Sequence, residues 1–433
     1  MNERNFSIQV LLNVEQGGYS SELLSKIPKN LNSQLIRQIV LGVIENDIFL
    51  EMAILGELDK PDKTLPQEVV TILKVGVYQK FFMNSIPDYA IVSESLNSCE
   101  YFKVTQYKGL VNSILRNIDN STIEEKISNM PSVNDRLKAK YSVSDDFYEL
   151  LFENYKIKTI RKILKSYVEV PDLVIRVNNL KTSTKELKYE LDNLNIEYEE
   201  HPFLEDALII IKASNLFETD IFNNGHFTIQ GGASILTSLV LNPEKNSKIL
   251  DICAAPGGKT CHLAEIVSNT GEFLANDLHE QKIEKIKENA KRLGCKNIEY
   301  SNFDGVLFKE NLVNSFDYIL LDAPCSGSGI VSRNPEIKLR RTKSELEKLI
   351  ITQREIMDNC LKYLKVGGYL VYSTCSIFKQ ENEMQREYFL DRYENIKPVN
   401  FNYRDNNISY LSLMPYEKGT DGFFISKFQK TSN

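Results

Sequence analysis

Tryptophan is missing from the 433 residues of this chain, and its four histidines are scattered. No apolar run reaches the roughly 18 residues that a membrane-spanning helix requires, and the first residues contain no apolar signal segment. Histidine and cysteine nowhere show the spacing of a metal site. These absences argue against a membrane protein, a secreted protein and a metalloenzyme.

The chain also lacks an excess of basic residues. Its net charge of −7 excludes a generally basic nucleic-acid binder, so any contact with RNA must come from local positive patches. The seven cysteines are an odd number and lie far apart, which predicts free thiols in a reducing, cytoplasmic setting. The length allows two or three domains, and 42% hydrophobic residues suffice for packed cores.

Two common nucleotide-binding motifs are absent as well. No G-x-G-x-x-G occurs, which argues against a dinucleotide site. Gly258-Lys259-Thr260 ends like a phosphate-binding loop, but that motif requires a glycine five positions before Gly258, where Cys253 stands. The sequence therefore disfavours a P-loop NTPase.

What the chain does contain is a strand–turn–helix pattern in residues 249–268. A short apolar run ends in Ala-Ala-Pro-Gly-Gly, and an amphipathic segment with Leu263, Ile266 and Val267 follows. In an open parallel sheet such a turn lies at the carboxyl edge, where glycines let the backbone approach a ligand and the helix N-terminus presents free N–H groups. The pattern predicts a nucleotide-like cofactor.

Strands and helices alternate from this region to the end of the chain. We expect strands at 248–253, 272–276, 297–301, 317–322 and 368–373, and helices at 258–268, 280–293, 344–364 and 380–390. In the tail, 408–414 and 423–428 are expected to form an antiparallel hairpin. This rhythm is typical of a doubly wound α/β sheet with an antiparallel edge.

Acidic residues follow two of these strands. Asp277 stands where doubly wound folds bind the ribose hydroxyls of an adenosine, and Asp304 can reach the adenine edge. Alone, Asp277 would more often be a solvated loop residue. The ordered set of one glycine turn and two acids nevertheless describes an adenosine ligand without a pyrophosphate, and S-adenosylmethionine fits this description best.

Cys325 and Cys375 each follow a predicted strand and stand in polar loops. One helix connects the two strands, so we expect the strands to be near neighbours and both thiols to face one pocket. A thiolate that adds to C6 of cytosine makes C5 nucleophilic enough to take a methyl group, and Asp322 beside the base would help to carry the charge shift. A second cysteine could assist the final elimination. The residues alone do not rank the two thiols.

Residues 6–118 have a helical pattern throughout, and the polar, turn-rich segment 117–135 is a predicted linker. One apolar stripe at helical spacing comprises Leu35, Ile36, Ile39, Val40, Val43 and Ile44, and a further helix is expected at 65–82. Periodicity alone indicates an all-α packing or interaction domain.

The segment that follows is mixed. Residues 147–167 read as one or two helices, with strands at 173–178 and 207–212 around a helix at 184–194, which predicts a small α+β subdomain. Two basic groups could hold RNA phosphates, although each also fits a solvated helix face. They are Lys156, Lys158, Arg161, Lys162 and Lys165, and then Lys338, Arg340, Arg341 and Lys343.

Three segments of the helical part carry a family resemblance. They are residues 75–79 (Val-Gly-Val-Tyr-Gln), the Ile86-Pro87 break before Val92 and Glu94, and residues 110–116. Together they resemble the antitermination factor NusB, a helical RNA-binding module. The resemblance implies that this part of the chain grips structured RNA.

A second resemblance covers about residues 230–430. Residues 251–260, 322–327, 333–336, 373–376 and 419–424 together resemble the RNA cytosine-5 methyltransferases of the Nop2/Sun group. The resemblance implies a Rossmann-like class I sheet that uses S-adenosylmethionine, with Cys375 as nucleophile and Cys325 as release cysteine. DNA cytosine methyltransferases use a Pro-Cys pair instead, which would point to Cys325. The cofactor-binding residues implied by the resemblance are Cys253, Ala254, Ala255, Pro256, Gly257, Gly258, Lys259, Asp277, Asp304 and Asp322.

A NusB-like part joined to this catalytic part is similar to the members of the group that methylate 16S rRNA. We therefore predict a multidomain, monomeric, cytoplasmic 16S rRNA cytosine-C5 methyltransferase that uses S-adenosylmethionine and has no metal and no membrane contact. The predicted domains are an all-α NusB-like bundle (1–135), an α+β RNA-binding subdomain (136–229) and the catalytic α/β domain (230–433). Two alternatives stay open: the same chemistry on tRNA or another rRNA site, and a non-catalytic RNA-binding or antitermination factor.

Overall fold

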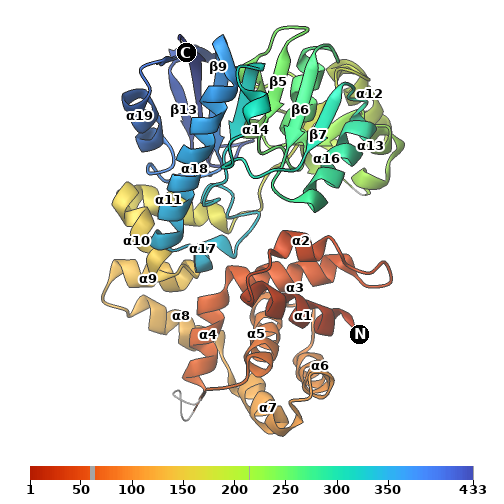
Figure 1. Cartoon of the computed structure of the whole chain (residues 1–433). Helices are drawn as coiled ribbons and strands as arrows, with labels where there is room; N and C mark the ends of the chain where they lie inside the picture. Colours follow the sequence, from red (N-terminus) through yellow and green to blue (C-terminus); the bar gives the residue numbers. More distant parts are fainter. Residues whose placement is uncertain (59–63, 214, 433) are drawn as a thin grey trace. The chain divides into compact units, whose positions relative to one another are not determined.

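The computed structural model describes residues 1–58, 64–213 and 215–432, which divide into two compact units (Figure 1). The first unit comprises Met1–Glu169 and Val331–Thr342, and the second comprises Val170–Ile330 and Lys343–Asn433. This division falls after Glu169, and the three domains at 1–135, 136–229 and 230–433 stay a prediction. In the described ranges we find no helix that is long and apolar enough to cross a membrane.

The first unit is helical, as its apolar periodicity predicts. Residues of the predicted stripe lie on α3 and pack against α5, where Ile36, Ile39 and Val40 are fully buried beside Val69 and Leu73. The helices up to residue 117 are α1 (Glu3–Glu15), α2 (Ser20–Leu24), α3 (Ser33–Glu45), α4 (Asp47–Gly56), α5 (Gln67–Phe82), α6 (Asp88–Tyr101), the short η1 (Thr105–Tyr107) and α7 (Lys108–Asn117).

The predicted linker at 117–135 is wrong, because most of it is helical. Residues Asn120–Ser128 form α8, and the Asp119 side chain accepts a hydrogen bond from the backbone N–H of Ser121 at its start. Ile123 and Ile127, four residues apart, are buried, so a single narrow stripe suffices to hold an otherwise polar helix. The unit continues with α9 (Val133–Tyr141), α10 (Asp145–Asn154), α11 (Ile157–Tyr167) and α17 (Ile337–Arg340).

The second unit begins with a small α+β subdomain, as predicted. Its antiparallel sheet has the order β2-β3-β1-β4, and Ile175, Leu187 and Leu208 share one core beneath the helices. The elements are β1 (Leu173–Val177), α12 (Thr184–Asn193), β2 (Glu197–Glu200), β3 (Ala207–Lys212), η2 (Leu216–Glu218), α13 (Asp220–Asn223) and β4 (Phe227–Ile229).

The larger sheet has the strand order β10-β14-β9-β8-β5-β6-β7, with β13 paired to β14. Strands β5 to β9 are parallel, whereas β10, β13 and β14 pair antiparallel, so the predicted antiparallel edge and tail hairpin are confirmed. The strands are β5 (Lys248–Asp251), β6 (Glu272–Asn276), β7 (Ile298–Ser301), β8 (Phe316–Asp322), β9 (Leu364–Thr374), β10 (Ile396–Pro398), β13 (Tyr410–Leu413) and β14 (Phe423–Lys430); β11 (Phe401–Tyr403) and β12 (Asn406–Ile408) form a separate hairpin.

Helices cover both faces of this sheet (Figure 1). Alternate strand residues point to opposite sides: Leu250 and Ile319 pack with Met357 of α18, whereas Ile249 and Leu320 pack with Leu236 of α14. Burial on both faces explains why these strands read as continuous apolar runs. The helices are α14 (Gly232–Leu241), α15 (Gly258–Ile266), α16 (Glu280–Leu293), η3 (Glu310–Leu312), α18 (Lys343–Tyr363) and α19 (Glu383–Arg392).

Candidate active site

The glycine turn connects β5 to α15 at the carboxyl end of the sheet, as predicted. Gly257 is the N-cap of α15 and has φ +96°, a left-handed conformation that glycine adopts without strain. The turn is tied to the next strand, because the Ala254 N–H donates to the Asn276 carbonyl at 2.8 Å. Cys253 in this turn is half-buried, and burial raises the pKa of its thiol well above the usual range. The raised pKa favours the neutral thiol of Cys253.

Three acids lie at the carboxyl ends of consecutive strands. Asp277 follows β6 and accepts a hydrogen bond from the Ala255 N–H at 3.2 Å, which joins it to the glycine turn. Asp304 follows β7 and is half-buried, and Asp322 ends β8. Because parallel strands present their carboxyl ends at one edge, the three carboxylates and the turn share that edge.

The described residues at this edge fit S-adenosylmethionine. Beside Gly258, a Cβ atom would meet only the Gln230 side chain at 3.8 Å, so the backbone of the turn is open to a ligand. The first N–H groups of α15 carry a partial positive charge, which attracts anionic ligand groups such as a carboxylate. Asp277 and Asp304 offer acceptors to the hydroxyl and amino groups of an adenosine.

Lys259 and Asp322 form an ion pair inside the candidate site. The Lys259 ammonium donates to Asp322 Oδ2 at 2.6 Å, and the Ser373 hydroxyl donates to Asp322 Oδ1 at 2.7 Å. Burial lowers the pKa of Lys259, but the charge and hydrogen bond of Asp322 and the charge of Cys375 outweigh it and raise the pKa. The raised pKa favours the charged form of Lys259, and its ion pair with Asp322 is a relationship that the motif alone did not reveal.

The two cysteines predicted to converge do so. Cys325 follows β8 and Cys375 follows β9, these strands are parallel neighbours, and the two sulfur atoms lie 3.2 Å apart. Both residues are free and half-buried. The hydrogen bond with Cys375, together with burial, raises the pKa of Cys325 well above the usual range. The raised pKa favours the neutral thiol of Cys325.

Glu381 fixes the loop that carries Cys325, and sequence reasoning missed it. The fully buried carboxylate accepts from the Ser326 N–H at 2.8 Å, from the Ser326 hydroxyl at 2.5 Å and from the Gln353 amide at 3.0 Å. Burial raises the pKa of Glu381, although hydrogen bonds from Ser326, Ser376 and Gln353 act in the opposite direction.

The next residue, Asn382, fixes the loop that carries Cys375. Its Oδ1 accepts from the Thr374 hydroxyl at 2.5 Å, and its Nδ2 donates to the Ser376 carbonyl at 2.9 Å. Two consecutive residues, Glu381 and Asn382, therefore hold the loops of the two cysteines. The only sequence signal is their position shortly after the Cys375 loop, because polar residues there also fit an ordinary solvated helix start.

Asp251 lies beneath the turn and is almost fully buried. Its Oδ2 accepts from the Thr260 hydroxyl at 2.6 Å, and its Oδ1 has no hydrogen-bond partner in the part of the chain that the structure describes. Burial raises the pKa of Asp251 to about 7, despite the hydrogen bond from Thr260. Asp251 thus holds the first turn of α15 through Thr260, while burial disfavours its charged form.

The predicted phosphate contact of Lys338 is wrong. Its side chain is 1% exposed, and its ammonium donates to the backbone carbonyls of Glu45 and Tyr141 within the first unit. Its neighbour Glu336 is equally buried and accepts from the Ser20 N–H at 2.8 Å, while Arg340 donates to the Gly18 carbonyl at 3.0 Å. Lys338 and Arg340 therefore belong to the helical unit, because backbone carbonyls replace water around their cations, whereas Lys343 is exposed and belongs to the second unit.

Within the described ranges, no group of three or more His, Cys, Asp or Glu side chains could hold a metal ion.

Comparison with known families gives three matches. The model described as 16S rRNA methyltransferase RsmB/F matches residues 238–429, the NusB family matches residues 1–120, and a ferredoxin-like domain of RsmF/B-like methyltransferases matches residues 147–216.

Individual proteins are similar over the whole chain. The Bacillus subtilis protein named "Probable ribosomal RNA small subunit methyltransferase B" is 32% identical, over 99% of this chain and 98% of that protein. The Shewanella oneidensis protein named ribosomal RNA small subunit methyltransferase B is 31% identical over 100% of both. The crystal structure of NSun6 from Pyrococcus horikoshii with SFG, an analogue of S-adenosylmethionine, covers 67% of this chain and 99% of that one, with a TM-score of 0.59 and 25% identity.

Proposed function

Because this chain belongs to the RsmB/F family of S-adenosylmethionine-dependent rRNA cytosine-C5 methyltransferases, we propose that its substrate is a cytosine of 16S rRNA. The names of its relatives support the small-subunit substrate, and such a substrate implies work in the cytoplasm. The similarity extends far beyond the NusB-like part, which argues against a non-catalytic antitermination factor.

The proposed cofactor site comprises residues 253–259 with Asp277, Asp304 and Asp322. When bound, S-adenosylmethionine supplies an electrophilic methyl group. The turn would contact the ligand through its backbone, Asp277 would accept from ribose hydroxyls, and Asp304 would accept at the adenine edge. The target base must leave its stack to reach this edge, as bases do in other enzymes that modify them.

Cys375 is the proposed nucleophile. Its thiolate adds to C6 of the cytosine, and the electron pair of the C5–C6 double bond becomes available for the new bond at C5. The assignment of Cys375 follows the family resemblance, and the Lys259 ammonium, paired with Asp322 at 2.6 Å, places a cation at the same edge of the sheet. Asp322, fixed by Lys259 and Ser373, would face the cytosine ring and stabilise the shift of charge.

Cys325 is the proposed proton donor in product release. C5 loses its proton to water, the electron pair of that bond restores the double bond, and the bond between C6 and the Cys375 sulfur breaks. The Cys325 thiol then gives its proton to the departing sulfur and is reprotonated from solvent. The observation that carries this proposal is the 3.2 Å distance between the two sulfur atoms, together with the raised pKa of Cys325, which favours its neutral thiol.

Three variants test these roles on in-vitro-transcribed 16S rRNA with S-adenosylmethionine. We expect Cys375→Ala to abolish methylation, and Cys325→Ala to accumulate a covalent protein–RNA adduct that migrates slowly on a denaturing gel. The double variant controls for the identity of the attacking sulfur and should form no adduct. Full activity of Cys375→Ala, or adduct formation by the double variant, would contradict the assignment.

Mapping tests the substrate separately. Sequencing of 5-methylcytosine in total RNA, with and without the gene, should reveal one lost site in 16S rRNA. A site lost from tRNA or from another rRNA would keep the chemistry and overturn the proposed substrate.

A further inference from the structure

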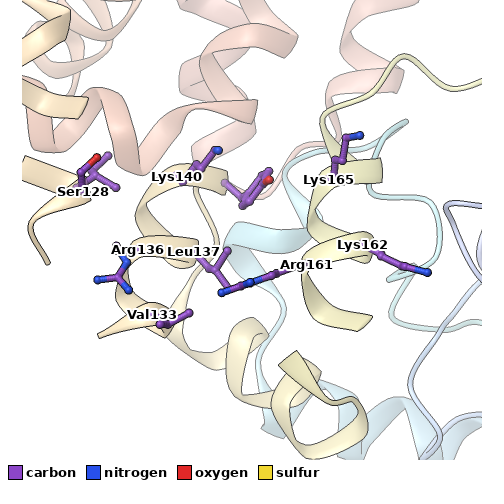
Figure 2. A pocket seen from close by; sticks show the side chains of 10 residues that line it. Ser128, Val133, Arg136, Leu137, Lys140, Arg161, Lys162 and Lys165 are labelled. Atoms are coloured by element: carbon purple, nitrogen blue, oxygen red, sulfur yellow. The ribbon is translucent and has the colours of Figure 1, made fainter. Parts of the chain in front are cut away.

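A cavity of about 500 Å³ lies between α8, α9 and α11 in the first unit (Figure 2). Half of the described residues that line it are cationic and none is acidic. We call it the basic cavity, and its cations are Arg136, Lys140, Arg161, Lys162 and Lys165. A concentration of positive charge in a chain of net charge −7 marks a local surface for an anion.

The helical repeat places these cations on shared helix faces. Arg136 and Lys140 are four residues apart on α9, and Arg161 and Lys165 are four apart on α11, so each pair shares one helix face. Figure 2 shows Arg161 extending from α11 toward Leu137 of α9. The cavity is thus flanked by cations of two helices.

Two acids of this region pair with a cation that does not line the cavity. Asp135 and Asp145 bind Lys138, at 2.9 and 2.6 Å, and Lys138 is not among the residues that line the cavity. Glu169 lies 3.5 Å from Lys165, but both side chains are largely exposed, and such pairs are weak and screened by salt. Neighbouring like charges repel one another, so the arrangement favours a polyanionic ligand.

We propose that the basic cavity binds phosphates of the substrate RNA. The identity of the polyanion rests on the proposed function, which supplies a structured RNA. Two apolar lining residues fit the same ligand. Leu137 is buried, and the half-buried Tyr141, whose ring centre lies 5.5 Å from the Lys140 ammonium, could also contact a sugar or base while the cations hold the phosphates. The cavity extends RNA binding beyond the residues 1–120 that resemble NusB.

The test compares two double variants, one within α11 and one at its N-terminal end. Arg161→Ala/Lys165→Ala removes two cations that line the basic cavity, whereas Lys156→Ala/Lys158→Ala removes two exposed cations of the same segment that do not line it. Alanine favours the helix, and circular dichroism verifies that both variants fold. Arg136 is left intact because its guanidinium also donates to the Met130 carbonyl.

The measurement is binding of in-vitro-transcribed 16S rRNA across a salt series. Each lost phosphate contact lowers the slope of log affinity against log salt by about 0.7–0.9, so the cavity variant should lose roughly 1.4–1.8 in slope and roughly 30-fold in affinity at 0.1 M salt. Its affinity for S-adenosylmethionine and its kcat at saturating RNA should stay unchanged, while KM for RNA rises. The control variant should retain the wild-type slope.

Equal slopes in the wild type and the cavity variant would overturn the proposal and direct attention to an acidic protein partner. An equal loss in both double variants would overturn it too, because the effect would then be general charge. The binding assay needs no methyl transfer. A wild type that binds 16S rRNA with the expected salt dependence but never methylates it would refute the proposed function and leave the cavity assignment intact.

Discussion

Replacing Glu381 with glutamine tests whether the position of Cys325 governs product release. In the wild type, both carboxylate oxygens accept hydrogen bonds from Ser326, directly after Cys325 in the chain. Glutamine keeps one oxygen for the Ser326 N–H and the Gln353 amide. Its NH₂ group would face the Ser326 hydroxyl, which can turn to donate to the Ser328 or Ser376 hydroxyl, at 3.2 and 3.1 Å. The variant should therefore fold, but the hydrogen bonds from Ser326 to a charged carboxylate are lost.

The magnitude follows from that one interaction. A hydrogen bond to a charged group is worth about 1.5–3 kcal/mol. If this loss appears in the placement of Cys325, release slows by roughly 10- to 160-fold, since about 1.36 kcal/mol corresponds to a factor of ten. Addition by Cys375 should be largely retained, because Asn382 still holds the Cys375 loop through Thr374 and the Ser376 carbonyl.

The assay separates the first turnover from later ones. Glu381→Gln should transfer the first methyl group at nearly the wild-type rate, turn over slowly thereafter, and accumulate part of the adduct expected for Cys325→Ala. Glu383→Gln is a matched control, because it makes the same change two residues away, where the carboxylate accepts from the exposed Ser412 hydroxyl and does not touch either cysteine loop within the described ranges. Wild-type turnover in folded Glu381→Gln, or equal slowing in the control, would refute the reasoning.

Stability provides an independent readout for the same variant. Burial raises the pKa of Glu381 above its usual 4.5, so the wild type loses stability as the pH rises from 4.5 toward the raised pKa. Glutamine does not titrate. At pH values above 4.5, the melting temperature of Glu381→Gln should therefore rise relative to that of the wild type, even as catalysis slows.

Three further changes have defined outcomes. Gly257→Ala places a Cβ atom on a left-handed backbone and 3.0 Å from Ile286. A strain of about 1–2 kcal/mol should weaken S-adenosylmethionine binding, measured by calorimetry, by roughly tenfold. Gly367→Ala is the control, because Gly367 also has a positive φ but open space around it, and this variant should keep the wild-type affinity. Asp251→Asn should gain stability relative to the wild type as the pH rises from about 4 to 7, because the raised pKa of Asp251 makes the folded wild type costly to ionise; a difference in melting temperature that does not vary with pH would contradict this. Burial lowers the pKa of Lys338 to about 8, so the wild type should gain stability over Lys338→Met between pH 8 and 10.5, as thermal unfolding would show.

Local patterns predicted much of the catalytic sheet. Strand β6 (Glu272–Asn276) and helix α16 (Glu280–Leu293) occupy the predicted residues, because a short apolar run and an amphipathic run are each ended by turn residues, Gly294 at φ +78° among them. The neighbouring positions of Cys325 and Cys375 followed from topology, although the connection between the two parallel strands contains the short α17 as well as the predicted long helix, α18.

Interactions between distant polar residues were not predictable in the same way. Glu381 lies in a run of polar residues that suits a solvated helix start, and nothing local distinguishes it from Glu383, yet only Glu381 of the two is fully buried. The basic run at Lys338 looks solvated for the same reason. Burial of a charge depends on which distant donors and acceptors surround it, and a sequence pattern contains no record of them.

The segment Val331–Thr342 has a consequence for how the protein is made. Its Glu336 and Lys338 complete the hydrogen bonding of a unit whose other residues end at Glu169. During synthesis on the ribosome, the segment that completes the helical unit is therefore made only after residues 170–330. A fragment that ends at Glu169 would leave Ser20 and the Glu45 carbonyl without these partners, so fragments for biochemical work should restore the segment, for example by fusing it back through a short linker.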